Sequence, residues 1–285
     1  MQIIPVIDLL STPFNQCCVV HAKRGQRQHY QPIQSLLTAS SAPLEIVTAI
    51  LELYPFQTLY IADLDAICGT GNNGSTIEAI SQVYPNLTIW LDCGIGQMNA
   101  RALHIGGNIR PVVGSENIQT LQDYRAISYA CQSKHVLSLD YSTAHDLNHD
   151  LNIGAMGVAE LYESARFWPD DTICMTLNAV GINQGVDIER LNMLIKMNNA
   201  RKSQSRLYAA GGVRNLADLQ VLTEIGVTGA LVATALHNKQ LSADDIEGLI
   251  QQKTRASSGS NMLITKTRTI PNLHELRACL LRLSL

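Results

Sequence analysis

The most constraining feature of this sequence is an alternation of short apolar segments with amphipathic segments, repeated eight times over about 250 residues. Short runs rich in β-branched residues are typical of buried strands, and the segments between them have helical periodicity. Eight evenly spaced repeats predict a (β/α)8 TIM barrel and disfavour the alternative, an open doubly wound sheet. The expected strands are residues 2–10, 58–67, 87–92, 109–116, 136–140, 172–177, 206–213 and 229–234.

The expected helices complete a barrel domain that spans residues 1–253, with a C-terminal extension over residues 254–285. In the extension, residues 256–261 have the Ser- and Gly-rich composition of a linker, and residues 273–283 suit a short amphipathic helix. We expect the extension to be peripheral. The helices are expected at residues 42–53, 77–83, 99–105, 121–129, 160–167, 188–197, 216–225 and 243–251, with an extra short strand at 17–22.

Composition excludes several classes of protein. A net charge of -3 gives no broad basic field for nucleic acid, and no apolar run is long enough to span a membrane. The seven cysteines are scattered and match no Cys or Cys/His metal spacing, so we expect reduced thiols, no metal and a cytoplasmic protein. A small metabolite is the expected partner, and an oligomer is compatible with the apolar content.

Carboxylates end several of the expected strands, where barrel enzymes place their active sites. Asp8 ends the first strand and Asp140 the fifth, so the two lie on opposite sides of a closed barrel. Two carboxylates that face each other across a ligand divide the roles of general acid and base when their environments separate their pKa values. The alternative is that both are structural hydrogen-bond acceptors.

Glycines follow other strands and suggest phosphate binding through backbone N–H groups. Gly211 and Gly212 end the seventh strand, next to Ala233 and Thr234 of the eighth. A tight turn before a helix is the alternative interpretation. A second candidate phosphate-binding site combines Gly94, after the third strand, with Gly114 and Ser115, after the fourth. Another candidate, Gly181, lies in the loop after the sixth strand.

A basic loop follows the short strand near residue 20. It carries Lys23, Arg24 and Arg27 close to a strand end. Loop cations at such a position are candidates for contact with an anionic substrate. An ordinary solvated basic loop is the alternative.

Four segments, taken together, resemble the histidine-biosynthesis barrels of the HisA/HisF type. The resemblance covers residues 1–251 and is nearer to the HisA isomerase, which converts a phosphorylated aminoaldose to an aminoketose by an Amadori rearrangement without cofactor or metal. It implies Asp8 as base, Asp140 as acid, Thr176 near the substrate, and Asp63 as a possible contact. The segments are residues 4–9, 59–66, 113–116 and 210–213.

The sequence also departs from the usual isomerase pattern. Asp92 and Cys93 stand where two glycines of a phosphate-binding run are expected, and Ala233 replaces a glycine. Residues 20–27 and 62–67 resemble a HisA-like branch of methanogens and methylotrophs. The alternatives to an aminoaldose isomerase are a repurposed barrel in one-carbon cofactor (tetrahydromethanopterin or methanofuran) biosynthesis and a non-catalytic ligand-binding or partner subunit.

Overall fold

The computed structural model describes residues 1–12, 16–22, 30–96, 107–142, 154–179 and 185–258. Eight parallel strands pair in chain order, and pairing of β1 with β9 closes them into a (β/α)8 barrel, which confirms the predicted fold. The strands of the barrel are β1 (Gln2–Ser11), β3 (Thr58–Asp63), β4 (Thr88–Asp92), β5 (Ile109–Gly114), β6 (Val136–Tyr141), β7 (Asp171–Thr176), β8 (Arg206–Ala210) and β9 (Gly229–Val232).

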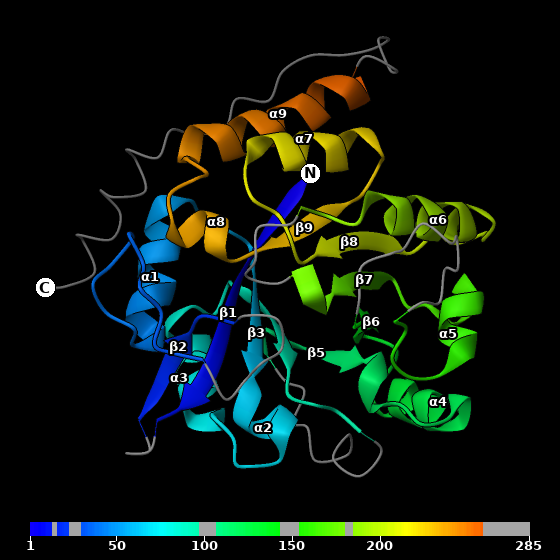
Figure 1. Ribbon diagram of the computed structural model, residues 1–285, viewed down its shortest axis with the longest axis horizontal. Helices are drawn as coiled ribbons and strands as arrows, with labels where there is room; N and C mark the ends of the chain where they lie inside the picture. The colour runs from blue at the N-terminus through cyan, green and yellow to red at the C-terminus, as the bar shows by residue number, and fades with distance from the viewer. Residues whose placement is uncertain (13–15, 23–29, 97–106, 143–153, 180–184, 259–285) are drawn as a thin grey trace, which may run out of the picture. The chain divides into compact units, whose positions relative to one another are not determined.

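Helices surround the strands (Figure 1). Asp63, Thr120, Asp187 and Asn215 each cap a helix by accepting a backbone N–H in its first turn, which explains where α2, α4, α6 and α7 begin. The helices are α1 (Pro43–Leu53), α2 (Leu64–Cys68), α3 (Gly74–Val83), α4 (Leu121–Ala130), α5 (Ala159–Glu163), α6 (Ile188–Asn199), α7 (Leu216–Glu224), α8 (Thr234–His237) and α9 (Ala243–Ser258).

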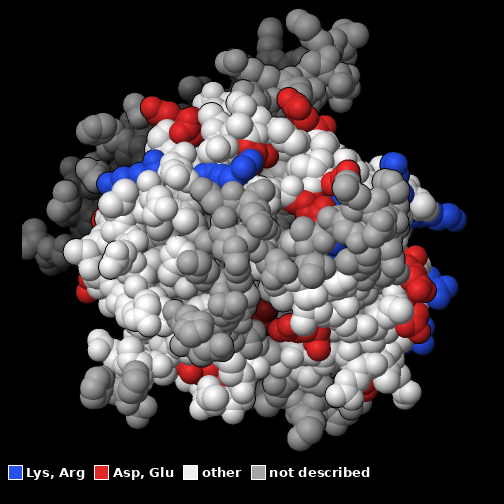
Figure 2. Space-filling view, in the orientation of Figure 1, with Lys and Arg blue, Asp and Glu red and all other residues white. Residues whose placement is uncertain are grey.

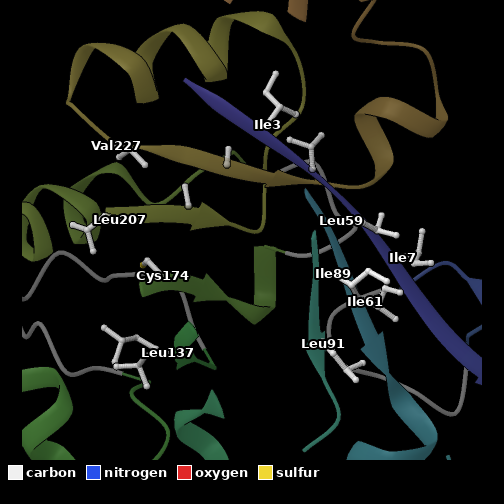
Figure 3. Packing of buried hydrophobic residues seen from close by; sticks show 14 of the residues in the cluster. Ile3, Ile7, Leu59, Ile61, Ile89, Leu91, Leu137, Cys174, Leu207 and Val227 are labelled. Carbon is white, nitrogen blue, oxygen red and sulfur yellow. The ribbon is translucent and has the colours of Figure 1, made fainter. Parts of the chain in front are cut away.

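Strand alternation sorts the core into two layers. One face of each strand packs against the helices, as Ile3, Ile7, Leu59 and Ile61 do in Figure 3. The other face fills the barrel with side chains that include Ile4, Tyr60, Trp90, Val136 and Tyr208. The parity of a residue along its strand therefore decides whether its side chain can reach the barrel interior.

An ion-pair cluster closes the amino-terminal end of the barrel. The fully buried Asp171 accepts from Arg110 at 2.8 Å, from Arg206 at 2.6 Å and from the Tyr208 hydroxyl at 3.1 Å. Burial alone would raise the pKa of Asp171, but the hydrogen bonds from the two arginines hold it below its usual value. We call this cluster, formed by Asp171, Arg110, Arg206 and Tyr208, the floor cluster, because it closes the barrel at the end opposite the carboxyl ends of the strands.

The strand β2 (Cys17–Val20) forms an antiparallel hairpin with the end of β1, in which Asp8 is paired with Val20. This pairing extends β1 beyond the barrel wall to Ser11. The short strand was predicted, with its end two residues later than observed. Its consequence is that the segment after residue 20 begins beside Asp8.

Several predicted boundaries are wrong: the strands expected at 109–116, 206–213 and 229–234 end at Gly114, Ala210 and Val232, and the helix expected at 160–167 ends at Glu163. Two further differences concern the segments beyond an element's end. The strand expected at 58–67 ends at Asp63, because the Asp63 carboxylate caps α2 by accepting the N–H of Ala66 at 3.2 Å. The helix α9 continues to Ser258, through the start of the linker expected at 256–261. The helix expected at 99–105 lies outside the described residues.

The chain forms two compact units, residues 1–250 and residues 251–285. The first contains the whole barrel. The described part of the second, residues 251–258, is the end of α9. No helix among the described residues combines the length and apolar character needed to cross a membrane.

Candidate active site

A cavity of about 560 Å3 opens at the carboxyl ends of the strands. Its walls come from inward-facing residues at or just beyond those ends, including Asp8 and Asp140, which face each other across the barrel because three strands separate β1 from β6 on either side. Asp92 and Glu116 add two more carboxylates, and among the described residues that line the cavity there is no Lys or Arg. Active sites of (β/α)8 barrels lie at this end.

Asp8 reaches the cavity through its place in β1. Its neighbours Ile7 and Leu9 are buried against the helices, so the alternating strand turns Asp8 inward, where it is half-buried. The hairpin with β2 fixes this stretch of backbone. The predicted base therefore lies on the cavity wall.

Asp140 is more deeply buried than Asp8. Its Oδ1 accepts from the Ser138 hydroxyl at 2.6 Å, and its Oδ2 lies 3.2 Å from Ser115 Oγ. Burial raises its pKa to about 8, with Asp92 and Glu116 adding to the rise and the Ser138 hydrogen bond opposing it. Asp140 is therefore a neutral acid at pH 7, able to donate a proton.

Gly114 and Ser115 serve Asp140 instead of lining the cavity themselves. A Cβ on Gly114 would lie 3.1 Å from Asp140 Oδ2, so glycine at this position leaves room for the carboxyl group. Ser115 is fully buried and accepts the Asp140 N–H at 2.9 Å. Both were predicted as phosphate ligands; each lies against Asp140, and the Ser115 hydroxyl is also hydrogen-bonded to Tyr162.

Tyr60 lies inside the barrel and binds one of the cavity carboxylates. Its hydroxyl donates to Asp92 Oδ2 at 3.0 Å. Burial raises the pKa of Tyr60 well above its usual value, and the charges of Asp92, Asp140 and Asp8 raise it further. Sequence reasoning missed Tyr60, although its inward parity in β3, two residues before Ala62, was readable.

The glycine pair after β8 forms a second wall of the cavity. Gly211 and Gly212 have φ of 90° and 84°, which favours glycine. A Cβ on Gly211 would lie 2.5 Å from the Thr176 carbonyl oxygen, and one on Gly212 would lie 2.0 Å from that of Gly185. Ala233 and Thr234 line the same cavity. The predicted phosphate residues after β8 and β9 are thus brought together.

Other predicted residues lie away from the cavity. Thr176 has outward parity in β7, and its contact with the site is the backbone carbonyl that packs beneath Gly211. Asp63 is buried and accepts from the N–H and side-chain amide of Asn73, at 2.7 and 2.8 Å. Gly94 donates its N–H to Asp92 Oδ1 at 3.1 Å, so a carboxylate lies beside the predicted phosphate-binding site.

Four predicted residues, Lys23, Arg24, Arg27 and Gly181, lie outside the described residues. The described ends of the basic loop, His21 and Tyr30, both line the cavity. In Figure 2, acidic side chains lie below the middle of the face shown and also along its upper and right edges, where most of the visible Lys and Arg side chains lie too.

His237 is a further cavity residue that sequence reasoning missed. It lies in α8, and its Nδ1 is 3.0 Å from the Ser35 hydroxyl. Burial, and then the neighbouring His21, lower the pKa of His237 to about 4, so it is neutral at pH 7. Its position beside Ala233 and Thr234 puts a hydrogen-bonding ring next to the glycine wall. No group of His, Cys, Asp or Glu in the described part of the chain is arranged to hold a metal ion.

The closed barrel places the chain in the class of (β/α)8 barrel proteins, here with two opposed aspartates at the carboxyl ends of the strands. Residues 2–242 match the family described as histidine biosynthesis protein. The chain belongs to this family.

Individual relatives support the same placement. A Methanocaldococcus jannaschii protein whose name states no function is 30% identical over 248 residues, 86% of this chain and 97% of its own length. Two relatives are named 1-(5-phosphoribosyl)-5-((5-phosphoribosylamino)methylideneamino) imidazole-4-carboxamide isomerase. The one from Myxococcus xanthus is 25% identical over 67% of this chain and 79% of its own length; that from Nitrosopumilus maritimus is 24% identical over 88% and 100%. The distant relatives thus support isomerase activity at the level of the family.

Proposed function

We propose that this protein is an isomerase that converts a phosphorylated aminoaldose to the corresponding aminoketose. The observation that carries the proposal is the pairing across one cavity of a buried, neutral Asp140 with a half-buried Asp8. Groups held in different environments divide acid and base roles. The names of the isomerase relatives supply the reaction class.

In this mechanism Asp140 donates its proton to the ring oxygen of the sugar. The bond between that oxygen and C1 breaks, and the amine lone pair forms an iminium at C1. Asp8 then removes the proton from C2, which gives an enolamine. Asp8 returns that proton to C1, and the C2 hydroxyl gives its proton to Asp140 as the ketone forms. Both carboxyl groups end in their starting states, so no other reactant is needed.

The phosphate of the substrate is placed at the wall formed by Gly211, Gly212, Ala233 and Thr234. Backbone N–H groups in a left-handed turn bind phosphate oxygens without a cation. The opposite end of the cavity is acidic, since Asp92 lies beside Gly94 and would repel a second phosphate. We therefore propose a substrate that is held mainly through one phosphate. The reduced cysteines predicted from the sequence make the cytoplasm the proposed location.

The test is turnover of the aminoaldose named in the relatives by the wild-type protein, beside Asp8→Asn and Asp123→Asn. Asp123 is a half-buried carboxylate in the first turn of α4 that accepts the Thr120 N–H at 3.1 Å, so its replacement controls for loss of charge outside the cavity. We expect turnover that Asp8→Asn reduces by 10²-fold or more and Asp123→Asn leaves unchanged. Folded wild-type protein without turnover would refute this substrate, and equal activity of Asp8→Asn would refute the base.

The single-phosphate proposal has its own measurement. An aminoaldose that lacks the phosphate at the imidazole end is compared with the complete substrate. Similar values of kcat/KM for the two would support one phosphate grip. A large loss with the truncated compound would show that the acidic end holds a phosphate after all.

A further inference from the structure

We infer that Tyr162 is a positioning residue for Asp140, which it controls through the hydroxyl group of Ser115. The inference rests on the proposed function only in taking Asp140 as the acid. The three side chains come from different elements: Tyr162 from α5, Ser115 from the 3-10 turn Ser115–Asn117 after β5, and Asp140 from β6.

The hydroxyl of Tyr162 has more partners than protons. Its oxygen lies 2.9 Å from the carbonyl oxygen of Asp140 and 2.8 Å from that of Met156, and it accepts the Met156 N–H at 3.2 Å. It is also hydrogen-bonded to Ser115 Oγ. If its single proton pointed to Ser115, two carbonyl oxygens would face its lone pairs at short range. The proton of Tyr162 therefore points to a carbonyl, and Ser115 is the donor in the bond between the hydroxyls.

This direction determines what Ser115 offers Asp140. Having given its only proton to Tyr162, Ser115 Oγ keeps two lone pairs. One accepts the Asp140 N–H at 2.9 Å, and the other faces Asp140 Oδ2 at 3.2 Å. A lone pair at that distance accepts a proton from a carboxylic acid but repels a carboxylate. Both lone pairs of Ser115 Oγ therefore have a donor when Asp140 is neutral, and Asp140 Oδ2 also accepts the Glu116 N–H at 3.4 Å.

Packing holds the chain in this arrangement. The exposed fractions of Ser115, Tyr162 and Asp140 are 0%, 2% and 6%, so little water reaches them, and interactions between buried dipoles are strong. The Tyr162 ring makes an edge contact with Tyr141 at 5.1 Å between centroids. Gly157, with φ of 119°, lies so close to the Ser115 carbonyl that a Cβ would be 2.0 Å from it. These contacts hold the Tyr162 ring and the Ser115 backbone in place.

Removing the Tyr162 hydroxyl reverses the direction of the Ser115 hydrogen bond. In Tyr162→Phe the acceptor that remains among the described contacts of Ser115 Oγ is Asp140 Oδ2, where the Ser115 proton stabilises the carboxylate. The pKa of Asp140 is then expected to fall by one unit or more, which is about a tenfold change in proton affinity. A purely structural role for Tyr162 would leave the protonation of Asp140 unchanged.

The experiment is a titration of the aspartate carboxyl groups in the full-length protein labelled with ¹³C at those positions. Asp140→Asn identifies the Asp140 signal by its disappearance. Tyr141→Phe is the matched control, because Tyr141 is a buried ring beside Tyr162 that makes no described contact with Ser115. We expect the Asp140 midpoint to fall in Tyr162→Phe and to stay in place in Tyr141→Phe. An unchanged or higher midpoint in Tyr162→Phe overturns the inference.

Ser115→Ala gives an independent test if Tyr162→Phe does not fold. When Ser115 is an acceptor for the Asp140 proton, its removal lowers the midpoint of Asp140. When Ser115 is instead a donor to the carboxylate, its removal raises the midpoint and the inference fails. These titrations use no substrate, so they separate this inference from the proposed reaction. Where turnover is measurable, Tyr162→Phe shifts the alkaline limb of kcat to lower pH and leaves KM unchanged.

Discussion

Replacement of Asp140 by Asn should stabilise the protein increasingly as the pH rises. The pKa of Asp140 is raised from 3.8 to about 8 in the folded protein, chiefly by burial. Between these values the folded state holds a proton that the unfolded state releases, so the free energy of unfolding contributed by this group falls with pH. Asp140→Asn has no carboxyl proton and loses this dependence.

The slope is about 1.4 kcal/mol for each pH unit between the two pKa values. From about pH 5 to about pH 7.5, the unfolding free energy of Asp140→Asn should therefore gain about 3 kcal/mol relative to the wild type. That is a large share of the ~5–15 kcal/mol that stabilises a typical domain. The wild-type protein loses this stability as the pH rises because burial favours the neutral form of Asp140 in the folded state, whereas the unfolded state releases the proton.

Urea unfolding at the two pH values measures this difference. Trp90 and Trp168 are both buried, so their fluorescence follows unfolding. Other titrating groups are common to both proteins and largely cancel in the comparison. A difference between Asp140→Asn and wild type that does not change with pH would refute the raised pKa, and with it the assignment of Asp140 as the acid.

Three further predictions concern the reaction, the glycine wall and the barrel floor. Because Asp140 must carry a proton, activity should fall as the pH rises above about 8, and a pH–rate profile with no alkaline limb would count against this. Gly211→Ala should weaken the binding of inorganic phosphate measured by calorimetry. Gly226 has a similar φ of 89° but open space around it, so Gly226→Ala should leave phosphate binding unchanged. Equal losses in the two variants would mean that backbone strain alone is responsible. Asp171→Asn should lower the free energy of unfolding by about 3 kcal/mol, because two arginines lose a buried partner. The control Asp218→Asn, in the more exposed pair with Arg214, should lower it by less than about 1 kcal/mol. Similar losses for the two variants in urea unfolding would contradict the role of the floor cluster.

The sequence was sufficient for the barrel because its information is periodic. Eight apolar segments at even spacing specify eight strands, and alternation along each strand specifies the inner face. Because Asp8 and Asp140 end the first and the fifth of eight strands, the strand order predicted that they lie on opposite sides of the barrel. Alternation, had it been applied to every strand, would have directed Thr176 outward and Tyr60 inward.

Boundaries were predicted less well, since they depend on single side-chain contacts. Asp63 was expected at a strand end facing a substrate, but it caps α2 and binds Asn73. The contact with Asn73 depends on whether the loop that carries this residue, ten positions later, folds back to the Asp63 carboxylate. The residues around Asp63 do not determine the path of that loop.

The sequence by itself determined the strand count, the opposed strand ends that carry Asp8 and Asp140, and the glycine pair after the seventh strand, because each follows from residue types and their spacing along the chain. Only the tertiary structure decided that Asp140 is neutral, that Asp92 binds Tyr60, and that Tyr162 reaches Ser115. These properties depend on burial and on contacts between elements separated by dozens of residues. Closure of the barrel creates this burial and these contacts, so no single segment of the sequence determines these properties.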